Sequence, residues 1–161
     1  MAGVIPIELQ RARYRLARER PYIAAALWRL VPVERPGLGT LAVDMYWRLY
    51  YDPIAIRSWT TEGLMAVLMH EVEHLLRRHS ERLKNYPCHV ANWAADAEIN
   101  DGKDPLYQHL PGNPITPEAL GLEPGKLAEE YANALLQERT PVPGQGGEDA
   151  KPSDGGDAGN G

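Results

Sequence analysis

The segment His70-Glu71-Val72-Glu73-His74 combines residue types that hydrolytic zinc sites use, at the spacing of the H-E-x-x-H pattern. Residues four apart on a helix are separated by about 40° around its axis, so the imidazoles of His70 and His74 project on one face. Two neutral imidazoles one turn apart can bind a single Zn²⁺ at N–Zn distances of about 2.0–2.1 Å. The segment therefore predicts a site for one zinc ion, Zn2+.

Glu71 lies beside His70 at the edge of that face. From there its carboxylate can reach a zinc-bound water without occupying a coordination position, and can take the proton of that water as it attacks a carbonyl carbon. The metal stabilises the developing oxyanion as a Lewis acid. The chemistry predicted for Glu71 is general-base catalysis of peptide-bond hydrolysis.

The alternative is a solvated helix whose histidines and glutamates form ordinary pairs with residues four positions along. Glu73 and Arg77 make such a pair, and we interpret Glu73 as a surface residue. The metal site is favoured because the helix expected here is capped, follows a predicted strand and carries apolar residues around both histidines.

A catalytic zinc needs a third protein ligand. His79 is nearest in the sequence, but on an unbroken helix it lies about 180° around from His70. We therefore expect His79 to point away from the metal and to have a structural or supporting role.

A carboxylate on the following helix is the better candidate for the third ligand. Gluzincins place this ligand on such a helix some twenty residues after the second histidine; Asp96 follows His74 by 22 residues and Glu98 by 24. Asp96 and Glu98 face different sides because they are two apart, and neighbouring alanines permit the close approach that a short aspartate needs. We choose Asp96, with Glu98 as the alternative.

The elements that position these residues follow from periodicity. The spacing predicts a helix over 7–31, kinked or restarted at Pro21, and the sequence "VERPGLG" then breaks it. Residues 40–51 read as one strand that ends in a turn at Asp52-Pro53. The apolar stripe of the first helix consists of Leu9, Ala12, Leu16, Ile23, Leu27 and Leu30.

The zinc-site helix is expected over 61–84 with Thr60 or Thr61 as its cap, and a further helix over 88–100. Residues 101–125 read as an ordered loop with short turns, and 125–139 as a last amphipathic helix. Its inward residues are predicted to be Leu127, Tyr131, Leu135 and Leu136.

Two segments follow from composition: one domain over 1–139, and a tail or linker over 140–161 that is expected to be disordered. The tail holds seven glycines, three prolines and a net charge of −3 from four acidic residues and one lysine. The whole chain has a net charge of −5, so −2 is left for the first 139 residues. This balance predicts no nucleic-acid footprint, although the tail offers a site for a protein partner.

Apolar runs are too short to span a bilayer, and the N-terminus lacks the apolar core of a signal peptide. Cys88 is the only cysteine, which excludes an intrachain disulfide and a cysteine-based zinc cluster. We expect a cytoplasmic protein that does not bind membranes.

Several segments resemble the putative metallopeptidase domain of bacterial proteins whose longer members carry a von Willebrand A-like domain downstream. They are "LAVDMYWRLYYDP", "LMHEVEHLLRRH", "NWAADAEIN" and "LPGNPITPEALGLEPGKLAEEYANAL", within roughly 7–139. The family signature W-N-x-A-A-D-x-x-I-N is matched in part, without the asparagine after Trp93 and with Asn92 before it. The family's Asn-Pro after the strand is replaced by Asp52-Pro53.

The resemblance implies a zincin-like α+β fold, mostly helical with a small sheet or hairpin packed by the H-E-x-x-H helix, and Asp96 as the third ligand. The first hypothesis for function is thus a zinc-dependent endopeptidase that acts on a peptide or protein substrate. The alternative is a non-catalytic zinc-binding or scaffold domain, and a metal-free interaction module is a third. For an oxyanion donor, the sequence offers His89, Tyr107, His109 and Tyr131 without selecting among them.

Overall fold

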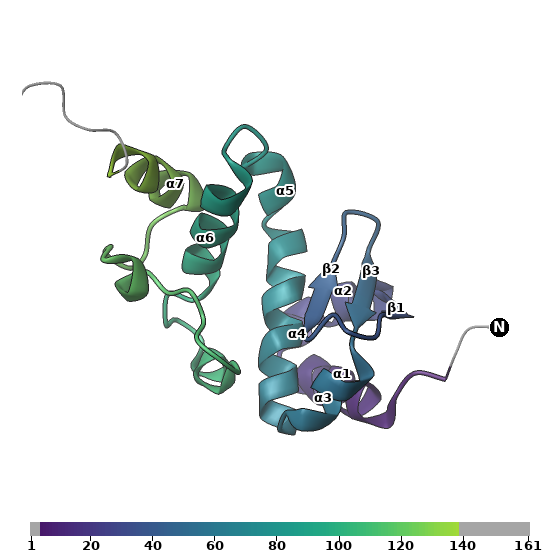
Figure 1. Ribbon diagram of the computed structural model, residues 1–161. Helices are drawn as coiled ribbons and strands as arrows, with labels where there is room; N and C mark the ends of the chain where they lie inside the picture. Colours follow the sequence, from purple (N-terminus) through teal and green to yellow (C-terminus); the bar gives the residue numbers. More distant parts are fainter. Residues whose placement is uncertain (1–3, 139–161) are drawn as a thin grey trace, which may run out of the picture.

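The computed structural model describes residues 4–138 of the chain. A long central helix, α4 (Thr61–Leu76), separates the sheet and the N-terminal helices on one side from the C-terminal helices on the other (Figure 1). Each side has its own hydrophobic cluster. The predicted fold class is confirmed: the domain is α+β and mostly helical, with a small sheet packed beside the H-E-x-x-H helix.

The N-terminal helices are α1 (Ile7–Glu19) and α2 (Ala24–Arg29), joined by the 3-10 turn η1 (Pro21–Ile23). Of the two outcomes predicted at Pro21, the restart is correct, since this proline stands at the first position of η1. All six residues of the predicted stripe are buried. Contrary to the prediction, the helical segment ends before Val31, because that residue begins a strand.

The sheet contains β1 (Val31–Glu34), β2 (Leu41–Val43) and β3 (Arg48–Tyr51) in the order β1-β3-β2. Strand β3 is parallel to β1 and antiparallel to β2. The prediction of one strand over 40–51 is wrong because a tight turn divides it. The Asp44 carboxylate accepts the backbone N–H groups of Tyr46 (2.9 Å) and Arg48 (3.1 Å), which stabilises this turn.

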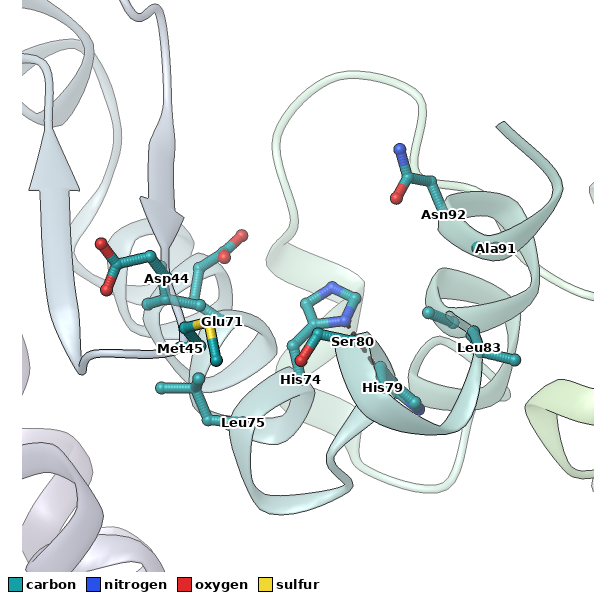
Figure 2. Close-up of a pocket in the computed structure, with 12 residues that line it drawn as sticks. Asp44, Met45, Glu71, His74, Leu75, His79, Ser80, Leu83, Ala91 and Asn92 are labelled. Atoms are coloured by element: carbon teal, nitrogen blue, oxygen red, sulfur yellow. Dashed lines mark hydrogen bonds between the residues drawn. The ribbon is translucent and has the colours of Figure 1, made fainter. Parts of the chain in front are cut away.

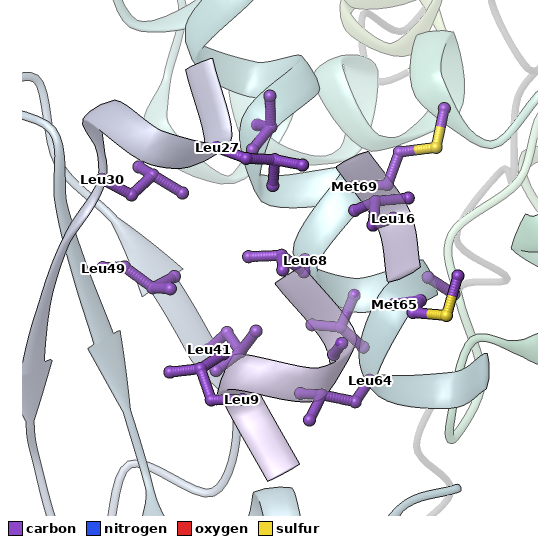
Figure 3. Packing of buried hydrophobic residues seen from close by; sticks show 14 of the residues in the cluster. Leu9, Leu16, Leu27, Leu30, Leu41, Leu49, Leu64, Met65, Leu68 and Met69 are labelled. Carbon is purple, nitrogen blue, oxygen red and sulfur yellow. The ribbon is translucent and has the colours of Figure 1, made fainter. Parts of the chain in front are cut away.

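The chain enters the central helix through α3 (Pro53–Ser58), where the sequence predicted only a turn. Asp52 caps α3 by accepting the N–H of Ile54 at 2.9 Å. Helix α4 begins at Thr61 as predicted, and its cap is Thr60, whose hydroxyl accepts the N–H of Gly63 at 3.0 Å. Its apolar face packs against α1, α2 and the sheet to form the larger cluster (Figure 3).

The prediction that this helix continues to Lys84 is wrong. Helix α4 ends at Leu76, and Arg78 adopts the left-handed conformation (φ 55°, ψ 41°) before a short helix, α5 (His79–Arg82). The sequence holds no glycine or proline here to indicate a break. Polar contacts made by residues after the break stabilise it, for example a hydrogen bond from Arg82 Nη1 to the carbonyl of Arg77 (3.1 Å).

The C-terminal side consists of α6 (Cys88–Ile99) and α7 (Ala128–Gln137), connected by a loop with the short turns η2 (Pro105–His109) and η3 (Glu118–Leu120). Helix α6 and the loop agree with the prediction. Helix α7 begins later than predicted, so Leu127 precedes its first turn and is exposed rather than inward. The smaller cluster, between α6 and α7, is rich in alanine.

The predictions for the tail, residues 140–161, lie outside the described residues. Within residues 4–138, no helix has the length and apolar character needed to cross a membrane.

Candidate metal centre

The structure brings together His70 and His74 of α4 and Asp96 of α6. The Nε2 atoms of the two histidines lie 3.0 Å apart, and Asp96 Oδ1 lies 3.2 Å from each of them. Within the described part of the chain, these three residues form a group whose donor atoms could hold one metal ion. Both elements contribute because the two helices lie side by side (Figure 1).

The spacing of the three atoms fits a tetrahedral zinc site. Ligand atoms about 2.05 Å from a tetrahedral centre are separated from one another by about 3.3 Å. The observed separations of 3.0–3.2 Å are close to that edge length. Two imidazole nitrogens and one carboxylate oxygen are also a donor set that Zn²⁺ accepts in catalytic sites.

A hydrogen bond on the side of His70 away from the cluster determines the tautomer of its ring. The tautomer decides whether the nitrogen that faces the cluster carries a lone pair. The side-chain nitrogen of Asn100 donates to the carbonyl of Ile115 at 2.8 Å, so Asn100 Oδ1 is the atom that faces His70. His70 Nδ1–H donates to this oxygen at 3.0 Å. In the neutral ring, the proton is then on Nδ1 and the lone pair is on Nε2.

His74 has the corresponding support from a second histidine. Its Nδ1 lies 3.0 Å from Nδ1 of His79, and Nε2 of His79 contacts the Glu98 carboxylate. A carboxylate accepts but does not donate, so the His79 proton lies on Nε2 and its Nδ1 is an acceptor. His74 Nδ1–H therefore donates to His79, and His74 Nε2 keeps its lone pair.

The lone pairs of His70 Nε2, His74 Nε2 and Asp96 Oδ1 thus converge. A single proton cannot bond to all three atoms, whereas one metal cation between them can. The charge distribution agrees with a cation site. Burial opposes ionisation of Asp96, but its contacts with His70 and His74 outweigh burial and lower its pKa to about 2. Burial likewise disfavours a charged His70, yet contact with Asp96 raises the pKa of that imidazole.

Glu71 lies beside this cluster at the edge of the sheet, as Figure 2 shows for Glu71 and His74. Burial raises the pKa of its carboxyl, and the neighbouring histidines and a hydrogen bond from the backbone of Val43 offset only part of that effect. A carboxyl of raised pKa is suited to accept a proton near neutral pH. The bond to Val43 ties the Glu71 side chain to β2.

Two hollows meet at Glu71. The α5-side hollow, of about 260 Å³, lies between the β2–β3 turn and α5 and α6, with apolar walls from Met45, Leu75 and Leu83 (Figure 2). The loop-side hollow, of about 210 Å³, lies between α4 and the segment 110–115 and includes Asp96. Because both include Glu71 and one of the paired histidines, they form the two arms of a cleft across the metal centre.

Several expectations about neighbouring residues need correction. His79 does not point away from the centre, because the break before α5 turns it back toward His74. Glu73 pairs with Arg77 at 2.8 Å as predicted, but it is largely buried and not a surface residue. Glu98, the alternative third ligand, contacts His79 and not the candidate metal ligands.

The residues named as candidate oxyanion donors line neither hollow. The hydroxyl of Tyr131, for example, donates to the carbonyl of Glu123 at 2.9 Å and has a structural role. The supporting residue that sequence reasoning missed is Asn100. Its position four residues after Asp96 puts both on one face of α6, and this spacing was the available signal.

Comparison with known proteins agrees with this geometry. A family model described as "Putative metallopeptidase domain" matches residues 5–160. Comparison with curated proteins and with solved structures gives no match. The family match spans nearly the whole chain and includes every residue of the candidate centre. The chain belongs to the putative metallopeptidase domain family.

Proposed function

We propose that this protein is a zinc-dependent metallopeptidase with a zincin-like centre, in which His70, His74 and Asp96 bind one Zn²⁺ and Glu71 is the general base. The observation that carries the proposal is the convergence of three lone pairs at 3.0–3.2 Å beside a half-buried carboxyl of raised pKa. Membership of a metallopeptidase family supports the same reaction class.

A zinc ion bound by these three residues supplies an acidified water and a Lewis acid for the carbonyl oxygen. Glu71 is placed to take a proton from the attacking water and to pass it to the departing amine nitrogen as the C–N bond breaks. Its raised pKa serves both steps, because the group must bind the proton and then release it. Asn100 keeps the His70 imidazole in the tautomer that the site needs.

The substrate is inferred to be an extended peptide along β2. This strand is at the edge of the sheet. Thr40 C=O and Asp44 N–H bond to the β3 side, so the backbone groups of Leu41 and the carbonyl of Val43 are directed to the open edge, while the N–H of Val43 donates to Glu71. A peptide added there as a further strand passes Glu71. The α5-side hollow is smaller than a small-molecule pocket and suits one apolar side chain of the substrate.

The decisive experiment is Glu71→Gln with a peptide-library cleavage assay and elemental analysis. We expect the variant to keep one zinc per chain and to lose about 10²- to 10⁴-fold in hydrolysis rate. Glu73→Gln is the matched control, since it changes the other glutamate of the motif, which pairs with Arg77, and should retain hydrolysis.

Two outcomes would contradict the proposal in different ways. A wild-type protein purified without chelator that holds no stoichiometric metal would exclude the zinc site. A zinc-loaded protein that cleaves no peptide at a rate above that of Glu71→Gln would favour the scaffold alternative.

The cellular location, the protein partner and the relation to longer proteins are also proposals. A cytoplasmic location and a protein partner for the segment 140–161 follow from the sequence, as does the relation to longer proteins with a von Willebrand A-like domain.

A further inference from the structure

We propose that His79 and Glu98 are positioning residues that hold His74 in its metal-binding tautomer. The inference rests on the proposed function, since the metal centre is what the two residues would serve. It assigns a role to the hydrogen-bonded chain His74–His79–Glu98, which extends from α4 through α5 to α6.

The direction of the hydrogen bonds in this chain is fixed at its far end. Glu98 can only accept, which puts a proton on His79 Nε2 and leaves His79 Nδ1 to accept from His74. If His79 carried its proton on Nδ1 instead, two N–H groups would face each other at 3.0 Å. His74 would then be driven to carry its proton on Nε2, where the metal must bind.

Glu98 is held as an ionised acceptor by arginines. Glu98 is buried, and its carboxylate contacts the Nε2 atom of His79. Arg82 lies 3.3 Å from the carboxylate and Arg77 lies 3.9 Å from it. Arg82 also donates to Glu129 of α7 at 2.7 Å, so the acceptor is fixed to three helices.

The backbone is shaped to place His79 at this position. A straight continuation of α4 would direct His79 to the opposite side, and it is the left-handed Arg78 that returns it. This conformation is sterically unfavourable for a residue that carries a Cβ atom, as Arg78 does. The side chain of His79 is only 4% exposed although it is polar, which is consistent with a specific bonding role.

The two candidate histidine ligands are thus supported by different groups that do the same work. His70 donates to the amide oxygen of Asn100, and His74 donates to the ring nitrogen of His79. Asparagine and histidine both carry their acceptor atom on Cγ. His79→Asn should therefore conserve the acceptor that His74 needs, whereas His79→Leu removes it.

The test compares zinc affinity, measured by competition with a chelator, among full-length variants. His79→Leu should lose about 10- to 100-fold in affinity. His79→Asn should stay close to wild type. Glu98→Gln should fall between them, because the glutamine amide can face His79 as an acceptor or as a donor. Asp104→Asn, a carboxylate-to-amide change far along the loop, is the matched control and should leave affinity unchanged.

The Co²⁺-loaded proteins supply a second readout, since the visible absorption of Co²⁺ reports the ligand geometry. We expect this spectrum to change in His79→Leu and to be preserved in His79→Asn. Thermal unfolding of the metal-free variants checks that each is folded. If His79→Leu does not fold, the test is the comparison of zinc affinity between Glu98→Gln and Asp104→Asn.

Wild-type affinity and spectrum in folded His79→Leu would overturn the proposal, as would equal losses in His79→Leu and His79→Asn. So would equal affinities of Glu98→Gln and Asp104→Asn. A wild-type protein that binds no zinc overturns both this inference and the proposed function. A wild-type protein that binds zinc without cleaving peptides overturns only the catalytic part, and the affinity series still decides the positioning role.

Discussion

The hydrophobic clusters on the two sides of α4 contain different types of buried side chain. The larger cluster, with α1, α2 and the sheet, is filled mainly by leucine, isoleucine and methionine side chains (Figure 3). The smaller cluster, with α6 and α7, contains five alanines among nine buried residues. Both sides supply the candidate metal centre, since the histidines come from α4 and Asp96 comes from α6.

The difference in side-chain size suggests that the two clusters contribute differently to the stability of the fold. Large side chains bury much apolar surface and stabilise the scaffold that positions His70, Glu71 and His74. Alanines bury little apolar surface but let α6 and α7 pack closely together. We infer that the smaller cluster depends more on polar contacts and on bound metal for its stability.

The largest expected effect is on the scaffold side. Leu68 of α4 is fully buried in the larger cluster, so Leu68→Ala should lower the free energy of unfolding by about 2–5 kcal/mol through lost burial and a cavity. Chemical denaturation of the metal-free protein measures this value. Leu127→Ala makes the same substitution at an exposed residue and should change stability by less than about 0.5 kcal/mol. Similar losses in both variants would remove the basis for calling the larger cluster the scaffold.

The second expected effect concerns metal removal. Zinc at 100 times its Kd stabilises the folded state by about 2.7 kcal/mol, so chelation should speed hydrogen exchange in α6 and α7 by about 100-fold. In the chelated protein, amides of α6 and α7 should exchange faster than those of α1. Exchange of all these helices at one rate would mean that the two sides unfold together, and the distinction drawn here would be wrong.

Features that depend on local periodicity could be predicted from the sequence. The stripe from Leu9 to Leu30 is buried as expected, since a residue's place on a helix face is set by 3.6 residues per turn. The same rule predicted that His70 and His74 share a face. The approach of Asp96 was also predicted, because the following helix offered a carboxylate at a suitable spacing among alanines.

Features that depend on tertiary contacts could not be predicted. Arg77 and Arg78 favour helix by composition, and the break between α4 and α5 is stabilised by contacts with distant residues such as Glu98. The prediction that His79 points away from the metal is therefore wrong, although its expected supporting role is consistent with the contact with His74. The division of 40–51 into two strands likewise depends on the side chain of Asp44 in the turn, which strand propensity does not report.

The smallest expected effect contrasts a structural ion pair with the chain His74–His79–Glu98. Arg20 at the end of α1 donates two hydrogen bonds of 2.8 Å to Asp104, which caps η2. These bonds, chiefly those from Arg20, hold the pKa of Asp104 below its usual value. The ionised carboxylate therefore stabilises the fold above about pH 4, and this contribution is lost as pH falls through the lowered pKa.

Asp104→Asn should lower stability by about 1 kcal/mol at pH 7, and its deficit relative to wild type should shrink in acid. Urea denaturation across a pH series measures both quantities. Zinc affinity should not change, because the hydrogen bonds of the Asp104 side chain join it to Arg20 and Leu106 and not to the candidate ligands. A zinc affinity that fell as far as in Glu98→Gln would show that loss of any half-buried carboxylate weakens the centre, and the specific role assigned to Glu98 would then fail.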